Sequence, residues 1–143
     1  MQSAKRKIKV GLRPHPFYIY HKQRWRNVNE NVIEKKSFAF AIRIVNLNKY
    51  LIQDKKELIM SKQLLRCGTS IGANISEAER GQSRADFTAK MNIALKEANE
   101  TYYWLRLLNA TEYLDDRMFE SLEPDIKEIV AILTAICKKT NEK

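Results

Sequence analysis

The chain has 143 residues, enough for one domain with a single hydrophobic core. It carries 26 Lys+Arg against 17 Asp+Glu, a formal net charge of +9, and contains two cysteines. Cys67 and Cys137 lack both metal-ligand spacing and the density of a disulfide scaffold, which argues against a secreted, disulfide-stapled domain. No apolar run reaches the ~18 residues of a membrane span or resembles a signal peptide, so we expect a reduced, cytoplasmic protein without a membrane partner.

Most of the excess charge lies in the first 29 residues. This stretch holds eight basic groups and no acid, whereas residues 30–143 hold 18 basic and 17 acidic groups. Gly11, Pro14 and Pro16 interrupt it, and it shows no apolar period. Residues 1–29 are therefore predicted to form a flexible basic arm. The alternatives are an unstructured leader, or upstream sequence translated from a misassigned start codon.

The arm also combines cationic and aromatic side chains. Trp25 lies between Arg24 and Arg26, and basic groups interleaved with aromatics are typical of single-stranded nucleic-acid binding. The predicted nucleic-acid-binding residues are Lys5, Arg6, Lys7, Lys9, Arg13, Arg24, Trp25 and Arg26.

From residue 30 onward, helix start signals recur. Three positions show an N-cap residue followed three residues later by an acid, as in a capping box: Asn31 with Glu34, Asp54 with Glu57, and Ser83 with Asp86. Gly81 is predicted to end the second helix. Pro124 is expected in the first turn of a fourth helix that begins near Ser121, since a missing N–H costs little there.

Each predicted helix carries one apolar stripe at three- and four-residue steps. The stripes are Ile33, Ser37, Phe40, Ile44, Leu47 and Leu51; Met60, Leu64, Cys67, Ile71, Ile75 and Ala78; Phe87, Met91, Ala94, Ala98, Thr101, Leu105 and Leu108; and Ile126, Ile129, Val130, Leu133, Ile136 and Cys137. With short polar turns and no alternating strand pattern, the fold class is predicted to be all-α, an antiparallel up-and-down four-helix bundle over residues 30–143.

The second stripe contains an unusual run, GTSIGANISE, at residues 68–77. Glycine inside a helix costs about 1 kcal/mol relative to alanine, so two glycines one turn apart indicate that a neighbour needs a bare backbone. Gly68, Gly72 and Ser76 lie on one flank of the stripe, and we predict a close helix contact there, within the bundle or between subunits.

Asn74 and Glu77 lie on the other flank of this stripe, where burial would require partners. Lys90 on the third helix is a candidate partner. We interpret Asn74, Glu77 and Lys90 as a structural polar cluster that fixes helix register. The alternative is an active centre.

Catalysis has little support in the sequence. No histidine follows residue 21, which excludes a Ser-His or Cys-His pair and a His-based metal site in the bundle. We therefore predict no catalytic residues, no metal and no cofactor. The rival hypothesis is a nuclease-like enzyme that uses Glu77, Lys90 and Glu97.

Tyr103 is predicted to point away from the core, because it lies between Tyr102 and Trp104, which flank the third stripe. Aromatic residues are enriched at protein interfaces, so Tyr103 is a candidate for an oligomer interface. An ordinary exposed tyrosine is the alternative.

The run from residue 64 to 108 resembles a known family. Its marks are the block SIGANISE at residues 70–77, the turn at Gly81 and Ser83, the pair Asp86-Phe87, and the block KEANETYYWL at residues 96–105. These are similar to bacterial four-helix-bundle proteins found as open reading frames in intervening sequences of 23S ribosomal RNA genes (S23 proteins). They are also similar to the accessory protein of diversity-generating retroelements.

The resemblance implies a homo-oligomer, a barrel-like pentamer of bundles. For the retroelement accessory proteins it also implies binding of RNA or DNA and of a reverse transcriptase. We therefore expect a non-enzymatic, self-associating accessory or scaffold protein. A pure protein-interaction module without nucleic acid is the alternative.

Overall fold

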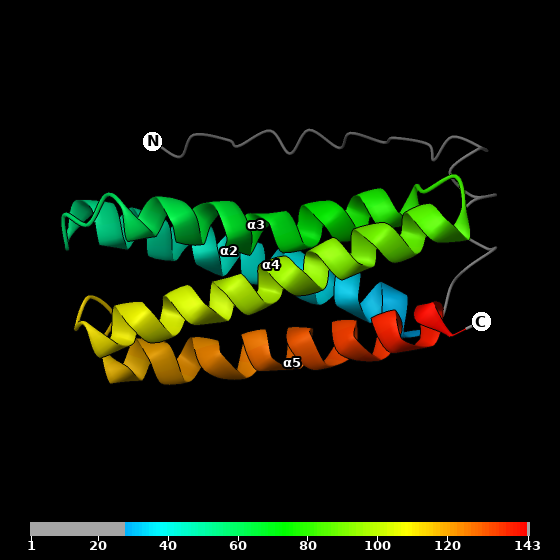
Figure 1. The fold of residues 1–143 in the computed structure, drawn as a ribbon. Helices are drawn as coiled ribbons and strands as arrows, with labels where there is room; N and C mark the ends of the chain where they lie inside the picture. The colour runs from blue at the N-terminus through cyan, green and yellow to red at the C-terminus, as the bar shows by residue number, and fades with distance from the viewer. Residues whose placement is uncertain (1–27, 143) are drawn as a thin grey trace, which may run out of the picture.

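The computed structural model describes residues 28–142, which form four helices and no strand (Figure 1). The helices are α2 (Val28–Gln53), α3 (Met60–Glu79), α4 (Arg84–Ala110) and α5 (Asp116–Asn141). Each packs mainly against its neighbours in a closed order, α2 on α3, α3 on α4, α4 on α5, and α5 back on α2. The predicted all-α bundle is confirmed, with α2 and α4 at diagonal corners.

The four predicted stripes form the core of this bundle. Their members are buried, except that Met60 and Val130 are half-buried at its edge. Leu114 and Leu122 complete the core near the start of α5, outside the predicted stripes. Because an amphipathic helix gains stability by removing its apolar face from water, this shared core explains why the helices assemble.

One of the three predicted caps is confirmed. The Ser83 hydroxyl accepts a hydrogen bond from the backbone N–H of Asp86 at 3.1 Å, at the start of α4. The cap at Asn31 is wrong, because α2 already begins at Val28 and so includes the last two residues of the predicted arm. Gly81 follows the C-cap residue of α3, Arg80, as expected of a helix stop.

The cap at Asp54 is also wrong, and Glu57 fulfils that role. The Glu57 carboxylate is buried and accepts hydrogen bonds from the backbone N–H groups of Ile59, Met60 and Ser61, at 3.0, 3.0 and 2.6 Å. Burial by itself raises the pKa of Glu57, but these hydrogen bonds outweigh it and hold the pKa below its usual value. The longer glutamate side chain thus satisfies the donors at the start of α3 that Asp54 was expected to satisfy.

The last helix starts earlier than predicted. The Asp115 carboxylate caps α5 by accepting a hydrogen bond from the backbone N–H of Met118 at 2.8 Å. Pro124 therefore lies inside α5 and not in its first turn. Its missing N–H leaves the carbonyl oxygen of Glu120 without its usual helical donor. At the next residue, Arg43 of α2 donates to the Ser121 carbonyl oxygen at 3.0 Å.

None of the helices in residues 28–142 combines the length and the apolar character needed to cross a bilayer.

Candidate functional site

The outer face of α2 carries a second apolar stripe. Phe38, Ile42, Val45 and Ile52 are exposed by 69, 50, 37 and 39%. They follow the three- and four-residue steps of a heptad seam, with Lys49 at the remaining position. We call these four residues the α2 stripe. On this helix, apolar side chains thus face both the core and the solvent.

An apolar groove of about 640 Å³ runs beside the α2 stripe, between α2 and α3. Small side chains from both helices form most of its lining: Glu34, Lys35, Ser37, Phe38, Ala41, Thr69, Gly72, Ala73 and Ser76. Two of the three residues predicted at a close helix contact, Gly72 and Ser76, therefore line the groove.

Gly68 occupies a different place from these two. It is buried, and a Cβ atom at Gly68 would lie 2.8 Å from the Ile44 side chain of α2, too close for a stable contact. A Cβ atom at Gly72 would lie 3.4 Å from the Ser37 hydroxyl oxygen. The bare backbone is thus required at Gly68, where α2 and α3 pack inside the bundle, whereas Gly72 leaves space at the surface.

The predicted polar cluster is not a buried unit. Glu77 and Lys90 form an ion pair with a 2.7 Å N–O distance, but their side chains are 59 and 40% exposed. Asn74 instead donates to the Ser70 carbonyl oxygen of its own helix at 2.8 Å. Burial is predicted because these residues flank the stripe, but Glu77 is exposed and Asn74 and Lys90 are only half-buried.

The residues of the nuclease hypothesis do not converge either. Glu97 lies 3.7 Å from Arg66, and Arg66 also donates to Glu100 at 2.6 Å. Arg66 and Glu77 are eleven residues apart on α3, which is roughly 16 Å along a helix. The contact of Glu97 with Arg66 and the exposed Glu77–Lys90 pair are therefore separate.

Nothing in the described helices activates a thiol nucleophile. Burial raises the pKa of Cys67 to about 11 and also raises the pKa of Cys137, so both thiols stay protonated at neutral pH. Across residues 28–142, no group of three cysteine, aspartate or glutamate side chains is placed to hold a metal ion.

Tyr103 is 55% exposed on α4 and packs edge-on against Trp104, with ring centroids 5.2 Å apart. Ile93 on the same helix is 41% exposed. These two residues are on α4, diagonally across the bundle from the α2 stripe.

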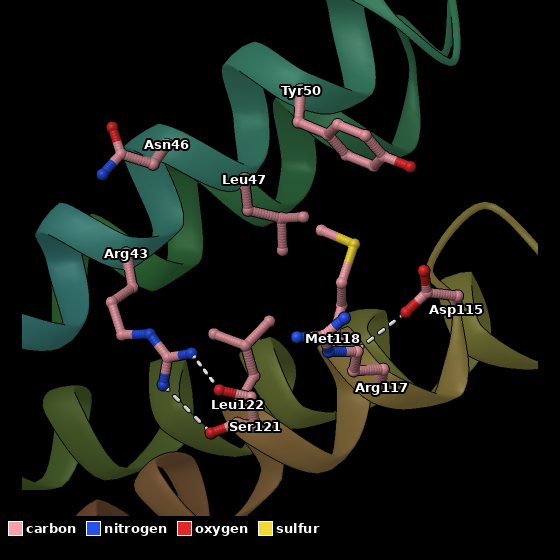
Figure 2. Close-up of a pocket in the computed structure, with 9 residues that line it drawn as sticks. All are labelled: Arg43, Asn46, Leu47, Tyr50, Asp115, Arg117, Met118, Ser121 and Leu122. Carbon is pink, nitrogen blue, oxygen red and sulfur yellow. Dashed lines mark hydrogen bonds between the residues drawn. The ribbon is translucent and has the colours of Figure 1, made fainter.

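A second cavity lies on the other flank of α2, where that helix meets the first turns of α5 (Figure 2). Arg43 spans the two helices there, with hydrogen bonds to the Ser121 carbonyl and hydroxyl oxygens and to Asp125. The sequence gives no local signal for this cavity, because the residues that meet in it are about 80 positions apart.

The predicted nucleic-acid-binding residues Lys5, Arg6, Lys7, Lys9, Arg13, Arg24, Trp25 and Arg26 lie outside the described residues.

The sequence model of the family described as 23S rRNA-intervening sequence protein matches residues 29–135. Among solved structures, the chain is similar to a protein of unknown function from the S23 ribosomal protein family of Bacteroides thetaiotaomicron. The two chains are 59% identical, and the match covers 77% of this chain and 98% of that one with a TM-score of 0.75. Among curated proteins, none matches this sequence.

Proposed function

Because the chain belongs to the family of 23S rRNA-intervening sequence proteins, we propose that it works as a self-associating bundle with an accessory or scaffold role and no catalysis of its own. The observation that carries this proposal is the α2 stripe. Single exposed apolar residues are normal, but four of them at heptad spacing on one helix, beside an apolar groove, are typical of a protein interface.

The α2 stripe has the geometry of a helix-packing seam. From Phe38 to Ile52 it spans two heptads, roughly 21 Å of helix, and it borders the α2–α3 groove along part of that length. Burying apolar surface contributes about 25 cal/mol per Å², so covering the stripe and the groove together would favour association. A second copy of the chain supplies helices of matching length.

The apolar residues of α4 favour a ring. Ile93 and Tyr103 are exposed on α4, diagonally across the bundle from the α2 stripe, and we call these two residues the α4 patch. An interface between two different patches is head-to-tail, and such interfaces close into rings or extend into filaments. We assign the α4 patch of one copy to the α2 stripe and groove of the next, in the pentamer that the family resemblance implies.

Contact along a nucleic-acid strand, or with an enzyme that acts on it, is assigned to residues 1–27. The described bundle has 17 Lys+Arg against 17 Asp+Glu, so it is neutral overall, whereas residues 1–27 hold eight basic groups and no acid. Nucleic-acid affinity depends mainly on neutralising phosphates, which favours the arm over the bundle.

Molar mass in solution tests self-association. The purified chain is expected to elute with a multiple of 16.8 kDa, and five copies for the ring. Ile42→Glu places a charge in the α2 stripe and is expected to lower the mass toward that of a single chain, whereas Ala135→Glu, on the exposed face of α5, should leave it unchanged. A single-chain mass for the unmodified protein at tens of micromolar would overturn the proposal.

Removal of residues 1–27 tests the role of the arm. The truncated chain should keep its helicity and its molar mass but lose salt-dependent binding to single-stranded RNA that carries a 5′-hydroxyl end. Unchanged RNA binding would show that the bundle, and not residues 1–27, carries the nucleic-acid-binding surface. If the full-length chain binds no RNA while the molar mass holds, the protein is an interaction module without nucleic acid.

A further inference from the structure

The cavity between α2 and α5 has the size and lining of a small-molecule site. It is open to solvent, has a volume of about 540 Å³ and is lined by Arg43, Asn46, Leu47, Tyr50, Asp115, Arg117, Met118, Ser121 and Leu122. Ligand sites typically occupy about 300–1,000 Å³ and combine an apolar floor with a few polar groups, often between the helices of a bundle. This cavity meets both conditions.

Its floor is apolar. Leu47 of α2 and Leu122 of α5 are each 4% exposed and face one another between the two helices (Figure 2). Tyr50 and Met118 are partly buried and extend this floor toward the end of the bundle. A flat ring laid on these four side chains would be shielded from water on one side.

Arg43 is held in place without using all its donors. The guanidinium group has five N–H donors. Three of them donate hydrogen bonds, to the Ser121 carbonyl oxygen at 3.0 Å, the Ser121 hydroxyl oxygen at 2.6 Å and the Asp125 carboxylate at 2.6 Å. Two donors remain for a ligand. An arginine fixed by its neighbours loses little further freedom when it binds an anion.

A second guanidinium lines the same cavity. Arg117, in the first turn of α5, is exposed and forms no ion pair with a residue in 28–142. The one carboxylate in the lining, Asp115, already accepts a hydrogen bond from the N–H of Met118. Arg43 is paired with Asp125, and Asp115 is engaged by the Met118 N–H, so the Arg117 guanidinium is the charge in the lining that is left for an anion.

We propose that this cavity binds a nucleoside monophosphate, either free or as the 5′-phosphorylated end of an RNA strand. The phosphate lies between Arg43 and Arg117, since planar guanidinium groups recognise phosphate oxygens in pairs. The base lies on the floor formed by Leu47, Met118 and Leu122. The Asn46 amide and the Tyr50 hydroxyl provide donors and acceptors for the base and the ribose.

The site does not depend on self-association. The α2 stripe lies on the outer face of α2 and the groove on the side toward α3, whereas the cavity lies on the side toward α5. A ring that covers the stripe therefore leaves the cavity open.

Titration of the full-length protein with adenosine 5′-monophosphate, followed by calorimetry and by amide chemical shifts, tests the proposal. We expect saturable binding, with shifts confined to residues 43–50 and 115–122. Adenosine lacks the phosphate group, and inorganic phosphate lacks the base and the ribose. Each should bind at least about tenfold more weakly than AMP.

Matched variants distinguish AMP binding in this cavity from non-specific electrostatic attraction to the protein surface. Arg117→Gln should weaken AMP binding about tenfold, because a charge-assisted contact is lost, and Asn46→Ala should weaken it by less. Arg84→Gln removes the same charge at the far end of the bundle, near the end of α5, and should leave the affinity unchanged. Both positions are exposed, so the fold is expected to persist.

A 5′-phosphorylated RNA tetranucleotide distinguishes the two sources of the ligand. Competition with AMP and tighter binding than AMP would assign the site to an RNA end, whereas equal or weaker binding would assign it to the free nucleotide. The proposal is overturned if AMP causes no shifts at millimolar concentration, or if Arg117→Gln and Arg84→Gln affect its binding equally.

Discussion

The two flanks of α2 are built from opposite chemistry. Toward α3, the contacts use small side chains, with Gly68 against Ile44 and Gly72 near Ser37. Toward α5, the contacts include ion pairs between half-exposed side chains, such as the Arg43–Asp125 pair. Small residues let two backbones approach closely and gain dispersion contacts, whereas half-exposed ion pairs hold helices together weakly and leave room between them. The first flank therefore contributes more to stability, and the second leaves a cavity.

Overpacking the α3 flank is expected to have the largest effect. Gly68→Leu forces a side chain into the space of Ile44, which is fully buried and branched at its Cβ atom, and should lower the free energy of unfolding by about 3 kcal/mol. Gly72→Ala is the control. Its Cβ atom meets ordinary contact distances and replaces a helical glycine, so stability should stay the same or rise by up to about 1 kcal/mol. Urea denaturation measures both, and equal effects would mean that the two glycines share one environment.

The Glu57 cap in the connection between α2 and α3 should make a pH-dependent contribution to the free energy of unfolding. Glu57→Gln removes the charge that caps α3 and should lower the free energy of unfolding by about 1 kcal/mol at pH 7. The folded-state pKa of Glu57 lies below its usual value of 4.5. Its contribution is therefore complete above about pH 4.5 and is lost as the pH falls through the folded-state pKa.

The stability gap between Glu57→Gln and the unmodified protein should accordingly shrink between pH 7 and pH 3. Asp54→Asn, at the exposed acid that the capping-box spacing predicts as the cap of this helix, serves as the control and should change little at either pH. A gap for Glu57→Gln that is constant with pH would show that the carboxylate charge has no part in the cap.

On the α5 flank, Arg43→Gln should cost about 1 kcal/mol, because three hydrogen bonds are lost at a site that is partly exposed. Lys36→Gln removes a single exposed pair with Glu128 and should cost less than about 0.5 kcal/mol. Thermal denaturation distinguishes the two variants. A loss for Arg43→Gln that matched Gly68→Leu would contradict the contrast between the flanks.

The smallest effect is expected at the surface pair between α3 and α4. Glu77→Gln should change the free energy of unfolding by less than about 0.5 kcal/mol, since both partners are exposed. A buried cluster would instead lose about 3–5 kcal/mol when one partner is removed. A loss of that size would indicate that Glu77 belongs to a buried polar cluster, as the sequence predicts.

The core could be predicted because its pattern is local. A stripe such as Phe87, Met91 and Ala94 repeats with the helix period, and burial follows that period. Helix starts were harder to locate. At the start of α3, Asp54 and Glu57 both precede the free N–H groups, and the longer Glu57 side chain is the one that reaches them.

The surface features depend on distances that a single sequence does not encode. The α2 stripe has a regular period of its own, but an inner and an outer apolar face look alike until the neighbouring helices are placed. Arg43 and Ser121 are 78 positions apart, so the cavity between them emerges only from the tertiary fold. For the same reason Glu77 was expected to be buried, although it is 59% exposed.

The accessibility of the α2 stripe in solution tests self-association most directly. The native Cys67 and Cys137 are buried, so a cysteine placed by Ile42→Cys or by Ala135→Cys can be labelled selectively with a thiol reagent. We expect labelling at position 42 to slow as the protein concentration rises, while labelling at position 135 stays constant. Equal rates at both positions over the whole concentration range would show that the α2 stripe stays in contact with water, and would contradict the proposed assembly.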